Sequence, residues 1–150
     1  SKAYSTFWKA DPSEVGTPQG TYLMRGLTIL YSPDKQGNGG TVDGINFPMG
    51  LSSGSNNGSW SNGVVPDGKN GLKFVAPGDG TWTVYALPGS GKTFYMGNAE
   101  SSVSLPGTNV AVKQDIAVEK GKTYYATVAG SKGNFLGSKF TAGVEGEDAV

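Results

Sequence analysis

The chain has 150 residues, enough for one domain with a substantial core, and its 12 Lys and Arg balance its 12 Asp and Glu. This zero net charge argues against general binding to nucleic acid or to an anionic membrane, because both would favour a basic excess. Since the chain has neither Cys nor His, disulfides, zinc sites built on thiolate or imidazole, and a Ser-His-Asp triad are excluded.

Glycine is unusually frequent, with 25 of 150 residues, and 8 prolines accompany it. Short segments rich in aromatic and β-branched residues stand between these turn formers, a pattern typical of an all-β protein. Strands are predicted within 3–10 and at 25–31, 41–47, 71–77, 81–87, 92–98, 110–119, 122–130 and 134–140. A turn is predicted at 32–40 and a long loop rich in Gly, Ser and Asn at 48–70.

This series of strands predicts a two-sheet antiparallel β-sandwich, jelly-roll-like, that fills a single domain at 1–141. Residues 142–150 are acidic and small, and we interpret them as a linker or tail. No apolar run approaches the roughly 20 residues of a membrane helix. Because the chain starts without Met and shows no leader, we expect it to be a piece of a larger protein.

Alternation with a period of two assigns side chains to the two faces of the predicted strands. The core positions are Leu72, Phe74, Ala76, Trp82, Val84, Ala86, Tyr124, Ala126 and Val128, and Trp8 is also expected in the core. The opposite face carries Lys73, Thr83, Tyr85, Tyr125 and Thr127. Tyrosine and threonine are good strand formers, so this face is either an ordinary solvated surface or a binding surface.

The stretch LPGSGKTFYM at 87–96 resembles the end of a phosphate-binding loop. That loop requires Gly-x-x-x-x-Gly-Lys-Ser/Thr followed by a helix. Ala86 stands where the first glycine belongs, and the residues after Thr93 favour a strand. We therefore interpret 81–98 as two strands joined by a hairpin turn, without nucleotide binding.

Trp60 is the most informative aromatic residue, because it lies in the loop sequence GSNNGSWSNG without alternating neighbours. It is either a staple that folds the loop back or a platform on which a sugar ring stacks. Lys69, Lys73 and Lys92 lie on or beside consecutive strands and could cluster despite the zero net charge. Most carboxylates stand beside Gly or Pro, where turns explain them.

Several segments occur in an order that resembles the non-catalytic β-sandwich modules of bacterial pectate lyases, in particular carbohydrate-binding module family 77. These segments are GLTI (26–29), TVDG (41–44), GLKFVAPGDGTWTVYA (71–86), the basic Lys92 and GNFLGSKF (133–140). The chain departs from the pattern at Phe47-Pro48-Met49-Gly50, where the relatives carry a basic residue. The resemblance implies a secreted, extracellular bacterial module, attached to a catalytic domain, that binds low-esterified homogalacturonan through basic side chains.

We therefore predict a monomeric, non-catalytic module of a plant-cell-wall-degrading enzyme, without a cofactor. Its expected ligand-binding residues are Trp60, Lys69, Lys73, Tyr85, Lys92, Tyr95 and Tyr125. Two alternatives remain: a binder of neutral β-glucan or xyloglucan by aromatic stacking, and a structural or adhesive sandwich of a cell-surface protein. A structural calcium is suggested by three Asp-Gly pairs, but none of them matches a known calcium loop.

Overall fold

The computed structural model describes residues 3–143, which form two six-stranded sheets packed face to face. Sheet A contains β1 (Ser5–Lys9), β4 (Lys35–Val42), β5 (Ile45–Ser52), β7 (Gly80–Ala86), β10 (Val112–Val118) and β12 (Phe135–Ala142). Sheet B contains β2 (Tyr22–Met24), β3 (Leu27–Ile29), β6 (Leu72–Val75), β8 (Thr93–Gly97), β9 (Ser102–Pro106) and β11 (Thr123–Ala129). One short 3-10 helix, η1 (Pro12–Glu14), follows β1.

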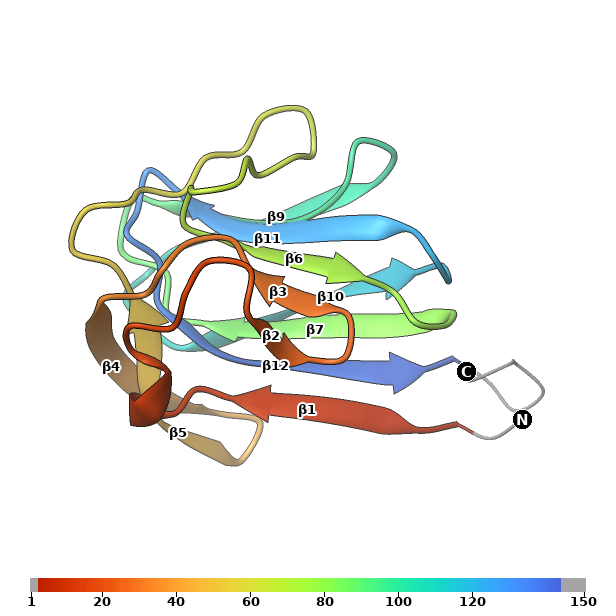
Figure 1. Cartoon of the computed structure of the whole chain (residues 1–150), viewed down its shortest axis with the longest axis horizontal. Coiled ribbons are helices and arrows are strands. Elements are labelled where there is room, and N and C mark those ends of the chain that lie inside the picture. The colour runs from red at the N-terminus through yellow and green to blue at the C-terminus, as the bar shows by residue number, and fades with distance from the viewer. Residues whose placement is uncertain (1–2, 144–150) are drawn as a thin grey trace.

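All of the pairings between named strands are antiparallel. Sheet A has the order β10-β7-β12-β5-β4, and β1 pairs with β12. Sheet B has the order β2-β3-β6-β11-β8-β9 (Figure 1). The predicted two-sheet antiparallel β-sandwich is therefore confirmed. β12 continues to Ala142, and the rest of the predicted tail at 142–150, except Gly143, lies outside the described residues.

The main core lies between the two sheets and contains all of the side chains that alternation placed there, Trp8 included. Aromatic rings join the sheets directly, since Phe74 of sheet B stacks on Trp82 of sheet A with centroids 4.9 Å apart. The Trp82 indole donates a hydrogen bond to the Ser138 hydroxyl at 2.8 Å, so its polar atom is also satisfied. This packing joins the inner faces of the two sheets.

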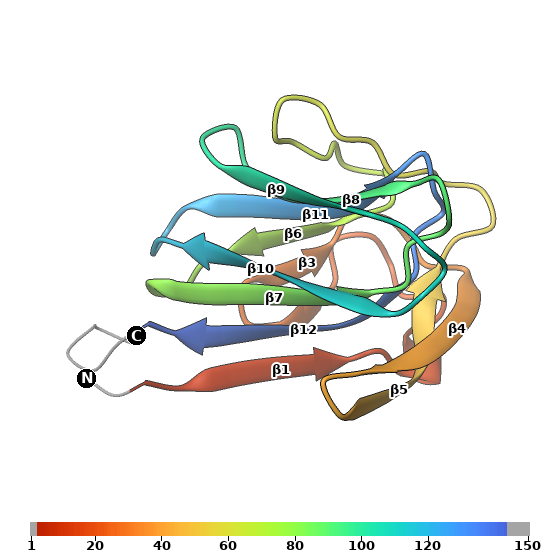
Figure 2. The ribbon, with the colours of Figure 1, turned by 180° about the vertical axis from the view of Figure 1, so that it is seen from behind.

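A second apolar cluster occupies the outer face of sheet A and contains the buried residues Phe47, Tyr85, Ala111 and Leu136. The β4–β5 hairpin curves across this end of the sandwich (Figure 2). The prediction of a turn at 32–40 and a strand at 41–47 was wrong here. The chain instead reverses at Asp43-Gly44, which both have positive φ, at 53° and 72°. An Asp-Gly pair with this geometry is a strong signal for a two-residue hairpin.

The segment at 81–98 is corrected as well. β7 belongs to sheet A and β8 to sheet B, so residues 87–92 connect the two sheets rather than closing a hairpin. No helix follows the Gly-Ser-Gly-Lys-Thr stretch, since Thr93 begins β8. β2 and β9 were not predicted from the sequence.

Candidate functional site

Polar and aromatic side chains form a row across the outer face of sheet B. In the strand register Tyr22 of β2 lies opposite Thr28, Thr28 opposite Lys73, and Lys73 opposite Tyr125 of β11. Directly opposite residues project from the same face of a sheet. Because adjacent strands lie about 4.8 Å apart, the row from Tyr22 to Tyr125 spans roughly 14 Å. Figure 1 shows β3, β6 and β11 side by side, with part of the loop at 53–71 above them.

One end of this row is hollowed into a groove of about 310 Å³. Tyr22 and Lys73 line it together with Thr28, Gln19 and Asp67. Tyr22 is 76% exposed, so its ring is presented to solvent rather than to the core. The groove therefore combines an exposed aromatic ring, one ammonium, one carboxylate and an amide.

The other end of the row continues to an aromatic pair. Tyr95 of β8 lies opposite Thr127, two residues beyond Tyr125 on β11, so the two tyrosines are diagonal neighbours on one face. Diagonal neighbours of this kind are about 7–8 Å apart, within reach of aromatic side chains. The indole of Trp60 stacks on the Tyr95 ring. We call Tyr22, Thr28, Lys73, Tyr125, Tyr95 and Trp60 together the aromatic–lysine face.

The β5–β6 loop, residues 53–71, holds Trp60 in place because it is bonded to the end of β11. Gly58 forms a bridge with Ala129, and its carbonyl accepts a hydrogen bond from the Gly130 N–H at 2.9 Å. The Thr127 hydroxyl donates to the Asn70 carbonyl at 2.7 Å. The predicted long loop at 48–70 is thus shorter than expected, because β5 extends to Ser52, and it is packed on sheet B.

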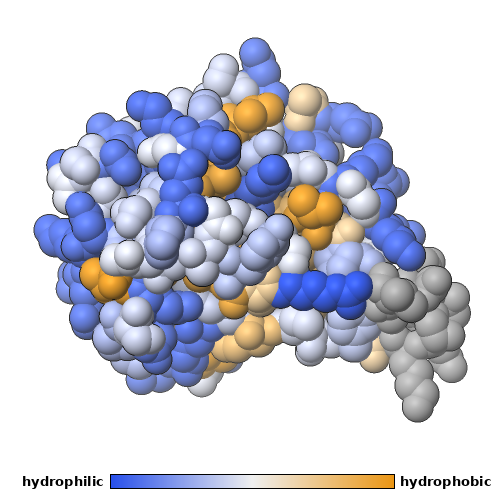
Figure 3. Space-filling model, viewed as in Figure 1, coloured by the Kyte–Doolittle hydropathy of each residue, from blue (hydrophilic) through white to orange (hydrophobic). Residues whose placement is uncertain are grey.

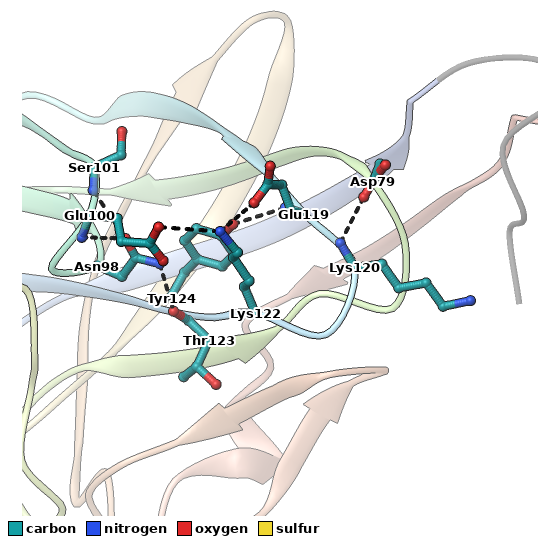
Figure 4. Close-up of polar contacts among 9 residues, drawn as sticks. All are labelled: Asp79, Asn98, Glu100, Ser101, Glu119, Lys120, Lys122, Thr123 and Tyr124. Carbon is teal, nitrogen blue, oxygen red and sulfur yellow. Dashed lines mark hydrogen bonds and ion pairs between the residues drawn. The ribbon is translucent and has the colours of Figure 1, made fainter.

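A polar network fixes the β8–β9 connection that follows Tyr95 (Figure 4). The Asn98 side chain accepts from the Glu100 N–H at 3.0 Å and donates to the Thr123 carbonyl at 3.2 Å. Lys122 lies between two carboxylates, 2.5 Å from Glu119 and 3.3 Å from Glu100. The hydrogen bonds that the Lys122 ammonium donates to these carboxylates, to Glu119 first and then to Glu100, raise the pKa of Lys122. Because Lys122 is paired with carboxylates of the same network, we interpret the network as one that stabilises the positions of β8 and β11 rather than as a ligand site.

The structure places the predicted site residues in four different surroundings. Lys73, Tyr125, Tyr95 and Trp60 are brought together on the aromatic–lysine face. Lys69 is exposed in the β5–β6 loop. Lys92 is exposed beside Gly130, five residues along β11 from Tyr125, or roughly 17 Å. The structure therefore does not gather the three lysines into one cluster.

Tyr85 requires a correction, because the expectation that it faces solvent was wrong. It is 1% exposed and packs against Phe47 in the second apolar cluster, on the other sheet. Thr83 and Thr127 are buried too. The physical reason is that both outer faces are partly covered, by the β4–β5 hairpin on sheet A and by the β5–β6 loop on sheet B. Alternation reports the two faces of a strand but not what covers them.

The lysines differ in whether a carboxylate neutralises their charge. Within residues 3–143, Lys113 and Lys122 form ion pairs, Lys113 with Asp43 at 2.8 Å. Lys73, by contrast, has no ion-pair partner among those residues. Its ammonium is therefore available to an anionic ligand, although Asp67 in the same groove lowers the local positive potential. Figure 3 shows this side of the molecule as blue and pale surface with small, separate orange areas.

Sequence reasoning missed Tyr22, Thr28, Gln19 and Asp67 as members of the site. No strand was predicted at Tyr22, so β2 was not expected, while Thr28 lies in the predicted strand at 25–31 and Asp67 in the predicted loop at 48–70 without being assigned to the site. The available signal was Thr-Tyr-Leu-Met directly after Gly20, a short strand pattern bounded by a turn residue.

Two of the three Asp-Gly pairs that suggested calcium have structural roles. Asp43 forms the β4–β5 turn, and Asp79 accepts a hydrogen bond from the Lys120 N–H at 2.8 Å. In the described part of the chain, no group of three or more acidic side chains is placed to hold a metal ion. Within those same residues, no helix is both long and apolar enough to span a membrane.

Comparison with known proteins supports the architecture. No protein-family model matches the chain, and no curated protein matches its sequence. One solved structure matches with a TM-score of 0.50 and 13% identity. It comes from work on the cellulosome of Ruminococcus flavefaciens, and the complexity of that cellulosome is described as reflecting an expansion in glycan recognition. The match covers 97% of each chain. At this identity the likeness shows a shared β-sandwich fold.

Proposed function

We propose that this chain is a non-catalytic carbohydrate-binding module of a secreted plant-cell-wall-degrading enzyme, and that it binds low-esterified homogalacturonan. The observation that carries the proposal is the aromatic–lysine face, whose residues are aligned across sheet B from Tyr22 to Trp60. The structural neighbour from a cellulosome, described in terms of glycan recognition, supports a sugar ligand. Such a module would keep an attached catalytic domain close to its substrate.

The direction of the face suits a linear polysaccharide. A sugar chain lying across the strands would pass Tyr22, Lys73 and Tyr125 in turn, and Trp60 and Tyr95 would extend the surface. Aromatic rings can pack against the apolar C–H faces of pyranose rings, while hydroxyl groups meet polar side chains. A carboxylate on each sugar would meet Lys73 in a charge-assisted hydrogen bond.

The charge contribution is modest for each contact, because exposed ion pairs are worth about 0–1 kcal/mol. Affinity in the micromolar range corresponds to about −8 kcal/mol. Stacking on Tyr22, Tyr125 and Trp60 must therefore supply most of the binding, with Lys73 selecting acidic chains. Lys69 and Lys92, which lie away from Lys73, would act only on a ligand long enough to pass them.

A neutral β-glucan or xyloglucan is the second candidate, and a specific observation favours it. Asp67 shares the groove with Lys73, so a carboxylated chain would meet repulsion as well as attraction there. A neutral chain would depend on the aromatic rings alone and would be insensitive to salt. A structural or adhesive sandwich, the third candidate, would bind neither polymer.

Calorimetric titration separates these candidates. We expect binding to polygalacturonate that weakens as salt rises, because exposed charges are screened, and that weakens on highly methyl-esterified pectin, where the carboxylate charge is lost. Salt-insensitive binding to xyloglucan without binding to polygalacturonate would instead favour the neutral candidate. Failure to bind any of these polymers would leave the structural role as the better account.

A further inference from the structure

A separate hollow lies on the other sheet, away from the aromatic–lysine face. It has a volume of about 730 Å³ and opens beside the β4–β5 hairpin. Three asparagines, Asn38, Asn46 and Asn109, line it, and all three are exposed. We call this hollow the amide groove.

All of the residues that line the amide groove are uncharged. The ammonium of Lys9 lies nearby but is engaged by the Asn46 carbonyl at 2.9 Å. A second lysine in this region, Lys113, is paired with Asp43, and Lys92 lies near Asn109 at the margin of the groove but does not line it. A ligand of this groove would therefore meet amide donors and acceptors rather than a net charge.

At two glycines of β4, Gly39 and Gly40, no side chain covers the backbone that faces the groove. A Cβ on Gly39 would lie 1.9 Å from the Phe47 carbonyl oxygen, and one on Gly40 would lie 2.5 Å from the Cβ of Ala111. Both distances are shorter than atoms can approach, so no side chain can replace these glycines without displacing the hairpin. β4 is an edge strand, so one side of its backbone is available for hydrogen bonds.

The groove also has an apolar component. Pro48 lines it and is exposed, and Leu87 lines it from the connection between the sheets. In the register, Gly39 lies opposite Pro48, between the pairs Asn38–Met49 and Gly40–Phe47. Since proline has no N–H, it can donate no backbone hydrogen bond toward β4 at this position.

We propose that the amide groove is a second binding site, and that its ligand is an uncharged sugar. Each amide side chain offers both a donor and an acceptor, which matches neighbouring hydroxyl groups of a pyranose. Pro48 and Leu87 offer apolar atoms to its C–H face. The proposal depends on residues distinct from those of the aromatic–lysine face, so either site can fail without the other.

The test is nuclear magnetic resonance titration of the whole chain with three neutral probes: cellohexaose, xylohexaose and a β-1,4-galactotetraose. At least one probe at millimolar concentration is expected to shift the backbone amides of Gly39 and Gly40 and the side-chain amides of Asn38 and Asn46. The double variant Asn38→Ala/Asn46→Ala should bind that probe with an affinity lower by on the order of tenfold, because it loses one or two hydrogen bonds.

Asn57→Ala removes an equally exposed amide outside the groove and should leave the affinity unchanged. Asn46 accepts only a long hydrogen bond of 3.5 Å from the Thr41 hydroxyl, whereas Asn109 accepts one of 2.9 Å from the Ser90 N–H and is not a suitable variant. The proposal is overturned if none of the three probes shifts these resonances, if they shift only residues of the aromatic–lysine face, or if the double variant binds as tightly as the wild type.

Discussion

The indole ring of Trp60 lies parallel to the phenol ring of Tyr95, with an interplanar angle of 4° and 5.3 Å between the ring centroids. This contact joins a loop residue to a strand of sheet B. Trp60 is half-buried, so Tyr95 covers part of the indole and the rest meets solvent. The staple and the platform, which the sequence left as alternatives, are therefore compatible in one side chain.

Trp60→Ala is expected to weaken polysaccharide binding about tenfold or more while the melting temperature falls by only a few degrees. An aromatic pair contributes about 0.5–1.5 kcal/mol, and 1 kcal/mol corresponds to roughly 2–4 °C in a domain of this size. Calorimetry and thermal unfolding measure the two effects. Trp60→Phe, which keeps a flat ring, should retain most of the affinity. A large fall in melting temperature with unchanged binding would make Trp60 a staple only.

Gly58→Ala tests whether the packing of the β5–β6 loop on β11 positions Trp60. A Cβ at Gly58 would stand 2.3 Å from both the Thr127 hydroxyl and the Val128 carbonyl oxygen, so the loop must move away. Such overpacking costs about 1–3 kcal/mol, and binding should weaken with it. Gly54→Ala is the matched control, because its nearest neighbour is an Asp34 oxygen 3.8 Å away. Equal behaviour of the two variants would show that this packing does not control the site.

Tyr85 is expected to support the fold rather than the ligand. Tyr85→Ala should lower the free energy of unfolding by about 3–5 kcal/mol, the usual cost of removing a buried aromatic ring. Tyr85→Phe keeps the ring and should leave polysaccharide affinity unchanged. Chemical denaturation measures the first effect and calorimetry the second. Loss of binding in a stably folded Tyr85→Phe would contradict the assignment.

Much of the fold could be predicted from the sequence, because one face of most strands is buried. The alternation of Trp82, Val84 and Ala86, and of Tyr124, Ala126 and Val128, identified the inner faces correctly. β4 was missed because Gly37, Gly39 and Gly40 give it the composition of a turn. Those glycines are instead required by the close approach of neighbouring backbone and side chains.

The candidate site was less predictable, because it depends on which strands become neighbours. Lys73 and Tyr125 are 52 positions apart and meet only because β6 pairs with β11. Lys92 looked close to Lys73 in the order of strands but lies toward the other end of β11. Tyr85 and Tyr125 have similar patterns in sequence, but Tyr85 is buried under the β4–β5 hairpin and Phe7, whereas Tyr125 is half-buried.

Tyr31 should make stability depend on pH in the alkaline range. Its hydroxyl is buried and donates a hydrogen bond to the Leu51 carbonyl at 3.1 Å. Burial raises the pKa of Tyr31, and this effect is larger than the lowering of the pKa by the Asn70 side chain. Above pH about 10 the unfolded chain releases this proton while the folded protein keeps it. The contribution of Tyr31 to the free energy of unfolding is therefore fully present below pH about 10. It is lost as the pH rises toward the pKa that Tyr31 has in the folded protein.

Tyr31→Phe is the corresponding variant. At neutral pH it should be about 1–2 kcal/mol less stable, because the Leu51 carbonyl loses its donor. The difference between wild type and variant should shrink as the pH is raised from 9 to about 11. Urea unfolding at a series of pH values measures it. A difference that stays constant across this range would contradict the expected ionisation.

The most direct test of the aromatic–lysine face is the dissociation constant for polygalacturonate in three variants at one low salt concentration. Lys73→Ala and Tyr125→Ala each remove one side chain from the face. Lys120→Ala removes an exposed lysine whose side chain points away from its neighbours (Figure 4) and leaves the net charge equal to that of Lys73→Ala. We expect Lys73→Ala and Tyr125→Ala to weaken binding at least fivefold, and Lys120→Ala to bind like the wild type. Equal affinity in all three variants would contradict the assignment of this face as the binding site.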